Sequence, residues 1–401
     1  MNPVREAWCR AYQAAFRAAI PVMPYREPFL LESTDDIAAL CTVLGYDSII
    51  IVTDAMISKL GLVDSTIQFC EAAGIKTVLY DKTIPNPTID NVEEVRKLYI
   101  ENGCQALVGF GGGSSMDCAK GAAARIARPN KPVQKMAGVL KVLAKVPTLI
   151  AVPTTAGTGS EVTVAAVITD AKTHHKFPIN DFCLIPRYAV HDYRLTTGLP
   201  KHITSTTGMD TLTHAVEAYI GQSTTKFTRA MAEEAVCLVH DYLKRAYDDG
   251  GDAEARQKML RAAYCGGIAF TQSYVGYVHG LAHALGGQYG TPHGLANAVI
   301  LPHMLRAYGE TCHASLAKLA RLIGLAGESI PDAQAADLFI AWVDQMNESM
   351  DIPKYISGIE ERDIPQLAIH ADAESNPLYP VPKLMDVDEL AEMFRVVGNL
   401  A

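Results

Sequence analysis

The sequence has no long run of Lys or Arg, and no window approaches the roughly 18 consecutive apolar residues that a membrane-spanning helix requires. Its 35 Lys and Arg are outnumbered by 44 Asp and Glu, which gives a formal net charge of −9. A nucleic-acid-binding protein would need a basic surface for the phosphate backbone. We therefore expect neither nucleic acid nor a membrane as a partner.

Closely spaced cysteine pairs are also missing, because the nine cysteines are scattered and none forms a C-x-x-C motif. An odd number of such cysteines is typical of reduced thiols. Residues 1–28 alternate Arg and Glu with Ala and aromatics, so they lack the unbroken apolar core of a signal peptide and predict an amphipathic helix. These absences favour a cytoplasmic protein.

The chain has 401 residues, which predicts two domains at about 100–200 residues each. Short apolar runs at 48–54, 76–81 and 105–110 alternate with segments of helical periodicity, as in a parallel sheet covered on both faces. We expect a doubly wound, Rossmann-like α/β domain over residues 1–200, with residues 1–28 as a helical extension. Asp90 and Glu93 are expected to cap the helix that follows the second strand.

After about Pro200 the pattern changes to 3.6-residue periodicity with almost no strand signal. We expect an all-helical domain over residues 201–401. The change of pattern alone places this boundary.

A glycine-rich stretch, GFGGGSSMDCAK, follows a predicted strand and opens a predicted helix. Such a loop aims backbone N–H groups at a phosphate. The stretch departs from G-x-G-x-x-G and follows the third strand rather than the first. The alternative is a tight turn without a ligand. The N–H groups would come from Gly111, Gly112, Gly113 and Ser114.

A second loop, PTTAGTGSEVT, follows another apolar run and offers the hydroxyls of Thr154, Thr155 and Thr163 beside glycines. Two such loops suit a dinucleotide. Asp54, which ends the first strand, would accept hydrogen bonds from ribose hydroxyls and repel a 2′-phosphate, which favours NAD over NADP. The alternative is that Asp54 caps the helix after it.

Asp210 and His214 stand at positions i and i+4, so both project from one face of a predicted helix. His279 and His283 repeat that spacing, and His293 follows the glycines that end their helix. One carboxylate and several imidazoles suit Zn²⁺ or Fe²⁺. The spacing leaves open whether His279 or His283 binds the metal, and core packing is the alternative for the whole set.

The motifs GGGSSMD, PTTAGTGSEVT, GMDTLTHAVEAY and HGLAHALGGQYGTPHG occur in this order. With them the chain resembles the iron-containing (group III) alcohol dehydrogenases over about residues 31–400. That family includes lactaldehyde reductases, 1,3-propanediol dehydrogenases and butanol dehydrogenases. The resemblance implies an N-terminal α/β cofactor domain, a C-terminal helical metal domain, NAD, Fe²⁺ with Zn²⁺ as the alternative, and a homodimer or higher homo-oligomer.

The resemblance also implies roles for individual residues. Of His279 and His283, it implies that His279 binds the metal and that His283 lies near the metal as a proton relay. It also implies that Phe270 is a wall of the substrate cavity. The implied metal ligands are Asp210, His214, His279 and His293. The implied cofactor contacts are Asp54, Asn86, Gly113, Ser114, Thr154, Thr155, Thr163, Lys176, Leu195 and Gly198.

Three departures from the family pattern stand out. Tyr193 replaces a proline before the LTTGLP motif, and DAESNPLYPVPK at 372–383 replaces a Gly-Asn-Pro-Arg-like turn that borders the active site in the family. Residues 1–28 are absent from many members, and we expect them to pack on the cofactor domain or to extend a dimer contact.

The resulting hypothesis is reversible hydride transfer between NAD and a small primary alcohol or diol, with the aldehyde as the oxidised product. One rival is a lyase similar to dehydroquinate synthase, which would need a Lys and Arg cluster for a phosphorylated substrate. Another is a non-catalytic NAD-binding protein, against which the intact ligand set argues.

Overall fold

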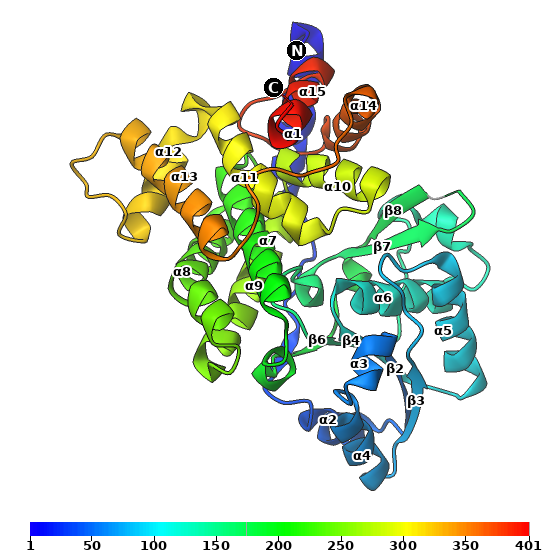
Figure 1. The fold of residues 1–401 in the computed structure, drawn as a ribbon. Helices are drawn as coiled ribbons and strands as arrows, with labels where there is room; N and C mark the ends of the chain where they lie inside the picture. The colour runs from blue at the N-terminus through cyan, green and yellow to red at the C-terminus, as the bar shows by residue number, and fades with distance from the viewer. Residues whose placement is uncertain (174, 401) are drawn as a thin grey trace. The chain divides into compact units, whose positions relative to one another are not determined.

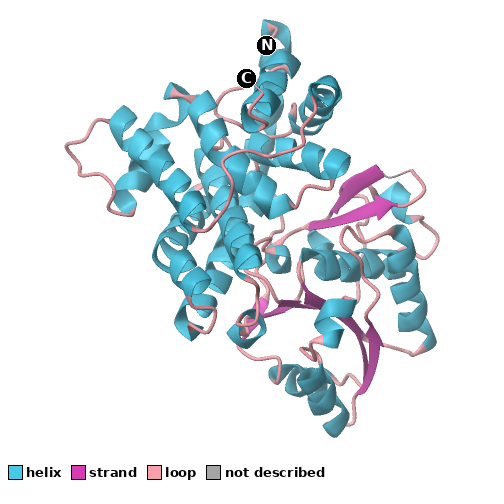
Figure 2. Cartoon of the chain, in the orientation of Figure 1, coloured by secondary structure: helices cyan, strands magenta, loops and turns pink. Residues whose placement is uncertain are grey.

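The computed structural model describes residues 1–173 and 175–400, which divide into two compact units. An α/β unit spans Pro24–Gly198, and a helical unit combines Met1–Met23 with the chain from Leu199 onward. Figure 1 gives the order of the elements by colour, and Figure 2 shows the strands, all of which belong to the α/β unit within the described part of the chain.

The α/β unit contains a six-stranded parallel sheet in the order β1-β9-β6-β4-β2-β3. The central strands are apolar and buried along their whole length, as expected for a sheet covered on both faces. The strands are β1 (Phe29–Leu31), β2 (Ser48–Val52), β3 (Lys76–Tyr80), β4 (Ala106–Gly111), β6 (Thr148–Pro153) and β9 (Tyr188–Val190).

Helices cover both faces of this sheet, and the alternation of side chains along β2 shows how. Ile49 and Ile51 join a core cluster with residues of α2 and α4, whereas Ile50 and Val52 join a second cluster with residues of α5 and α6. The doubly wound architecture is therefore confirmed. The helices are α2 (Asp36–Leu44), α3 (Ala55–Lys59), α4 (Asp64–Ala72), α5 (Ile89–Glu101) and α6 (Gly113–Ala127).

Two local features of this unit differ from expectation. A second sheet of β5 (Gly138–Val139), β8 (His175–Asn180) and β7 (Ala165–Asp170) was not predicted. Thr88, rather than Asp90, caps α5, and its partner is Asn91 rather than Glu93. The reason is that Thr88 is the last extended residue before the helix, so its hydroxyl can accept the backbone N–H of Asn91.

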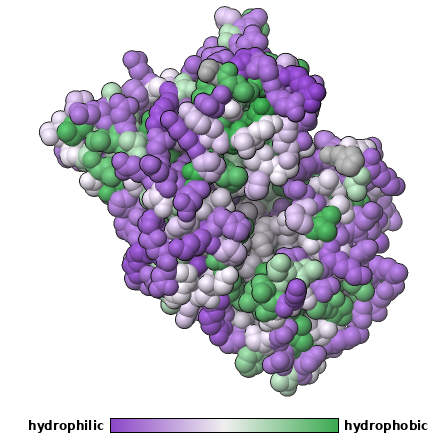
Figure 3. Space-filling view, in the orientation of Figure 1, coloured by the Kyte–Doolittle hydropathy of each residue, from purple (hydrophilic) through white to green (hydrophobic). Residues whose placement is uncertain are grey.

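The helical unit is built around α7, which packs against α8, α9 and α11. No helix in the described residues is long and apolar enough to cross a membrane. On the face shown in Figure 3, hydrophilic residues are mixed with small hydrophobic patches. The helices are α1 (Pro3–Ala19), α7 (Lys201–Ile220), α8 (Lys226–Asp248), α9 (Ala253–Ser273), α10 (Tyr277–Tyr289), α11 (His293–Tyr308), α12 (Glu310–Leu322), α13 (Asp332–Ser349), α14 (Ile364–Ser375) and α15 (Val387–Val397).

The N-terminal extension corrects the predicted division of the chain. Residues 1–23 group with the helical unit and not with the α/β domain, and the units meet in sequence between Gly198 and Leu199. The physical reason lies in polar side chains of α1: Arg5 donates to Asp372 Oδ2 at 2.6 Å, and Gln13 donates to the carbonyl of Tyr379 at 2.8 Å. The amphipathic pattern indicated the helix but not its partner.

Candidate metal centre and nucleotide loops

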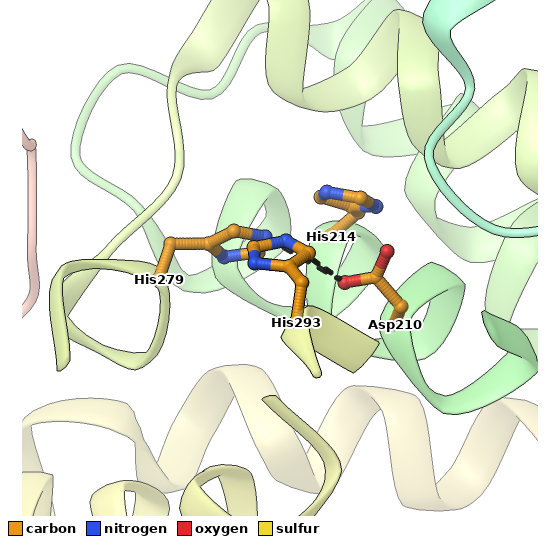
Figure 4. A group of neighbouring side chains, drawn as sticks. All are labelled: Asp210, His214, His279 and His293. Atoms are coloured by element: carbon orange, nitrogen blue, oxygen red, sulfur yellow. Dashed lines mark ion pairs between the residues drawn. The ribbon is translucent and has the colours of Figure 1, made fainter. Parts of the chain in front are cut away.

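Four side chains from three helices meet inside the helical unit, as Figure 4 shows. Helix α7 supplies two of them, and α10 and α11 supply one each. One nitrogen or carboxylate oxygen from each side chain lies within 4.8 Å of those of the others. We call this group the Asp–His cluster, and its members are Asp210, His214, His279 and His293.

The local sequence explains why these helices can come so close. Helix α10 ends at Tyr289 and is capped by Gly290, which adopts the left-handed conformation with a φ of 67°. Pro292 is the N-cap residue of α11, so His293 is the first residue of that helix. A Cβ on Gly294 would lie 2.5 Å from the carbonyl oxygen of Thr206 in α7. The glycine therefore permits the contact that brings His293 to Asp210.

Atoms of the cluster converge on the side-chain amide of Asn297, one turn after His293 on α11. The Asn297 Nδ2 atom lies 2.6 Å from Asp210 Oδ1, 3.2 Å from His279 Nε2 and 3.1 Å from His293 Nε2. An amide nitrogen only donates hydrogen bonds, so the facing oxygen and imidazole nitrogens are acceptors. Three acceptors that point to one place are suited to a cation.

Glu217, a residue that the sequence analysis missed, orients His279. Its Oε2 lies 2.6 Å from His279 Nδ1, and its Oε1 accepts the backbone N–H of Val278 at 2.8 Å. With the Nδ1 proton directed at Glu217, the Nε2 lone pair faces the cluster. Glu217 stands one turn after His214 in an apolar helix. An acidic residue in such a helix was the sequence feature that could have identified it as part of the site.

The charges of the site also fit a bound cation. Asp210 and Glu217 are both almost fully buried, and burial raises the pKa of Glu217 to about 8. Burial, followed by the neighbouring imidazoles, holds the pKa of His279 well below its ordinary value, so this histidine is neutral at pH 7. At a pKa of about 8, Glu217 is mostly protonated at pH 7 without a cation nearby, so its ionised form beside buried Asp210 and neutral imidazoles needs a compensating positive charge. A divalent metal at the cluster would supply it.

His283 lies beside the cluster rather than in it. Its ring stacks on that of His293 at 5.1 Å, and its Nδ1 is 2.5 Å from Glu374 Oε1. Phe270 stacks on His214 at 4.2 Å. Glu374 was not singled out from the sequence, because it lies far from His283 along the chain.

In the α/β unit, the parallel strands bring the two predicted loops to one edge of the sheet. Gly111 at the end of β4 pairs with Pro153 at the end of β6, and its carbonyl accepts the backbone N–H of Thr154 at 3.1 Å. Helix α6 begins at Gly113 without a side-chain cap. Its first N–H groups, from Gly113 and Ser114, are therefore suited to a phosphate.

Asp54 caps the helix after it, as one of the two predicted roles requires, and it also lies beside the glycine loop. Its Oδ1 accepts the backbone N–H groups of Met56 and Ile57, so it caps α3. Its Oδ2 faces the glycine loop, 3.7 Å from where a Cβ on Gly111 would lie. Gly112 faces Thr155 in the same way. Capping therefore leaves one carboxylate oxygen directed toward the loop where the cofactor is expected.

The other predicted cofactor residues are more dispersed. Lys176 on β8 donates to Asn86 Oδ1 at 2.8 Å, so these two meet each other. Leu195 lies in the hydrophobic core cluster that includes Ile49 and Ile51. Gly198 is exposed at the end of the unit. Contact between these residues and a cofactor stays a prediction.

A buried lysine, not singled out from the sequence, fixes the second loop. Lys120 on α6 directs its Nζ at five oxygens of the segment 160–165, at distances from 2.6 to 3.1 Å. One of them is the hydroxyl of Thr163, so that predicted cofactor residue is part of this contact. Asp117 on the same helix accepts from Ser160 Oγ at 3.0 Å.

Comparison with known proteins gives matches to both units. The family described as iron-containing alcohol dehydrogenase matches residues 29–193, and the Fe-containing alcohol dehydrogenase family, C-terminal, matches residues 204–397. Alcohol dehydrogenase 4 of Schizosaccharomyces pombe is 38% identical over 357 residues, which is 88% of this chain and 82% of that protein.

Two solved structures extend the comparison. A crystal structure of 1,3-propanediol oxidoreductase has a TM-score of 0.88 and 34% identity, and covers 92% of this chain and 97% of its own. Sulfoacetaldehyde reductase from Bifidobacterium kashiwanohense, in complex with NAD⁺, has a TM-score of 0.83 and 28% identity, with 94% and 99% covered.

Proposed function

Because this chain belongs to the iron-containing alcohol dehydrogenase family, we propose that the Asp–His cluster holds its iron and that its substrate is a small primary alcohol or diol. The protein is an oxidoreductase that interconverts alcohols and aldehydes with iron and NAD as cofactors. Neither a lyase similar to dehydroquinate synthase nor a non-catalytic NAD-binding protein is favoured.

The observation that carries the assignment of the cluster is the convergence of one carboxylate oxygen and the imidazole nitrogens within 4.8 Å in a buried site. Such a mixed nitrogen and oxygen set suits a first-row divalent metal. Glu217, hydrogen-bonded to His279, provides the outer carboxylate that commonly fixes a metal-binding histidine.

In this proposal, iron supplies a Lewis acid to the alcohol oxygen, and NAD supplies the hydride acceptor. Oxidation of an alcohol also releases a proton. His283 is proposed to receive it, because Glu374 holds its Nδ1 and leaves Nε2 as the proton acceptor. Phe270, stacked on His214, would limit the space for the substrate.

For the cofactor, the proposal places the pyrophosphate at the N-terminus of α6. The uncapped start of that helix and its neighbouring glycines support this placement. The proposed contacts are Asp54, Asn86, Gly111, Gly112, Gly113, Ser114, Thr154, Thr155, Thr163, Lys176, Leu195 and Gly198. A cytoplasmic homodimer or higher homo-oligomer completes the proposal, and sedimentation velocity would check the assembly.

The test is anaerobic purification with metal analysis, then NADH formation from a panel of short alcohols and diols. Fe²⁺ and Zn²⁺ are each restored to stripped protein. We expect turnover that depends on Fe²⁺ and is highest with small primary alcohols or diols. Stoichiometric metal with no NADH from any alcohol, and no NADH oxidation by aldehydes, would contradict the proposal.

A further inference from the structure

Helix α1 precedes residue 29, where the first family match begins, and it has two contrasting faces. One face exposes apolar side chains, among them Val4 and Trp8. The other directs polar side chains at α14 and at the loop 376–386, which connects α14 to α15. The amino group of Met1, just before α1, pairs at 2.9 Å with Asp386, which caps α15.

Two side chains of α1 hold the loop 376–386 by its main chain. The Arg10 guanidinium donates two hydrogen bonds at 2.7 and 2.9 Å, and the Gln13 amide donates two at 2.8 and 3.3 Å. Gln13 is only 3% exposed, and its own carbonyl accepts from Arg10 at 2.9 Å. The four acceptors are the carbonyls of Pro377, Tyr379, Val381 and Pro382.

The loop in turn reaches the metal centre through Tyr379. Its hydroxyl donates to Glu374 Oε1 at 2.6 Å, and the same oxygen is 2.5 Å from His283 Nδ1. His283 stacks on His293 of the Asp–His cluster. Tyr379 therefore connects α1 to the histidine beside the proposed iron site, because its carbonyl bonds to Gln13 and its hydroxyl bonds to Glu374.

Aromatic contacts make a second connection between the same elements. Phe16 of α1 packs on Tyr274 with ring centroids 4.6 Å apart, and Tyr274 is 6.3 Å from Tyr379. Tyr274 has a positive φ of 63°, which costs free energy for a residue with a side chain. It lies just before α10, the helix that carries His279 and His283. The packing of Phe16 helps to hold that turn.

We propose that α1 is a positioning element of the active site. Arg10 and Gln13 fix the loop 376–386, and Tyr379 and Glu374 transmit that order to His283. This inference rests on the proposed function, in which the Asp–His cluster beside His283 is the active site. It assigns a role to a segment outside both family matches, acting on the stretch 372–383 that departs from the family pattern.

The first test compares Arg10→Met and Gln13→Met with Arg17→Met in the full-length, iron-loaded enzyme. Arg17 is exposed on the same helix and serves as the matched control. Because each variant loses two hydrogen bonds to the loop, kcat should fall by about fivefold, while iron content and the KM for NAD stay unchanged. Arg17→Met should behave as wild type. Unchanged kcat in both test variants would overturn the proposal.

The second test asks whether α1 acts through Tyr379. If it does, Tyr379→Phe should lower kcat by itself, and adding Gln13→Met should have little further effect. Independent effects that multiply in the double variant would show that α1 acts by a different route and would overturn the proposed connection.

Amide hydrogen exchange of residues 377–386, measured with and without Fe²⁺, tests whether α1 holds this loop. The measurement does not depend on turnover. Exchange should be about fivefold faster in Gln13→Met than in Arg17→Met. Equal exchange rates in these two variants would show that Gln13 does not hold the loop, and would overturn the proposal. A wild-type protein that loads iron but oxidises no alcohol would instead overturn the proposed function, and the two failures are thereby distinguished.

Discussion

Glu217 and Asn297 hold the Asp–His cluster in place without being among its four proposed ligands. Glu217 lies 2.6 Å from His279 Nδ1, and the amide nitrogen of Asn297 lies within 3.2 Å of an atom in three of the cluster's side chains. Both side chains are buried. The geometry of the proposed iron site thus depends on the shell around it as much as on the ligands.

Replacing Glu217 by Gln should weaken iron binding about 10- to 100-fold. An amide offers one oxygen and one NH₂ group, whereas the carboxylate accepts from both His279 Nδ1 and the Val278 N–H. One of these donors would therefore face another donor. Competition with a chelator of known affinity would measure the change.

Glu348→Gln is the matched control, because Glu348 is exposed on α13. Its iron affinity should equal that of the wild type. An unchanged affinity in Glu217→Gln would mean that the hydrogen bond to His279 contributes nothing to metal binding.

The sequence predicted the residues that share a short local spacing and missed those that meet only in three dimensions. Asp210 and His214 are one helical turn apart, so periodicity alone places them on one face. Glu374 reaches His283 from α14, and no local pattern connects those positions. The choice between His279 and His283 likewise depended on the resemblance, because one helical turn offers both side chains.

Between helices, the site depends on close approach of α7 and α11. A Cβ at Gly294 would meet the main chain of Thr206 at 2.5 Å, and main chain cannot move aside as a flexible side chain can. The contact sets the position of His293 relative to Asp210, whose facing atoms are 3.5 Å apart.

Gly294→Ala should therefore destabilise the protein by about 1–3 kcal/mol and reduce its iron content, because the added methyl group separates α11 from α7. Urea unfolding and metal analysis would measure both effects. Gly287→Ala is the control, since nothing lies within 4 Å of the place that its methyl group would occupy and alanine favours a helix. Equal iron content in the two variants would argue against this packing constraint.

In the α/β unit, Lys120 connects α6 to the segment after the second loop. Burial lowers the pKa of Lys120 to about 8, and Asp117 opposes that shift. Lys120→Met would leave five oxygens and Asp117 without the ammonium group, at a cost of about 3–5 kcal/mol. We expect weaker NADH binding as well, which fluorescence titration would detect.

Lys131→Met provides the comparison for Lys120→Met, because Lys131 is only partly buried and bonds to a single carbonyl of the same unit. It should bind NADH with wild-type affinity. If Lys120→Met also binds NADH with wild-type affinity, the hydrogen bonds from Lys120 to segment 160–165 do not support the cofactor site.

Across the chain, the proposed iron and NAD sites are built by different units. The Asp–His cluster belongs wholly to the helical unit, and the two glycine loops belong wholly to the α/β unit. The switch from strand and helix alternation to continuous helical periodicity made this division visible in the sequence. The small second sheet was missed because its strands are partly exposed and β5 has only two residues.

Each cofactor should therefore protect a different part of the chain. Fe²⁺ at about 100 times its Kd should stabilise the protein by about 2.7 kcal/mol and slow amide exchange in α7, α10 and α11. NAD should slow exchange in the loops after β2, β4 and β6. Hydrogen exchange with each cofactor alone measures this. If Fe²⁺ slowed amide exchange in the loops but not in α7, α10 and α11, the assignment of iron to the Asp–His cluster would be contradicted.

The most direct measurement is anaerobic equilibrium dialysis of Fe²⁺ with stripped wild type, His279→Ala and His283→Ala. With the Asp–His cluster as the iron site, the wild type and His283→Ala should each bind one Fe²⁺ per chain, and His279→Ala should bind none at the same concentration. Full binding by His279→Ala, or equal loss of iron in both variants, would contradict the assignment.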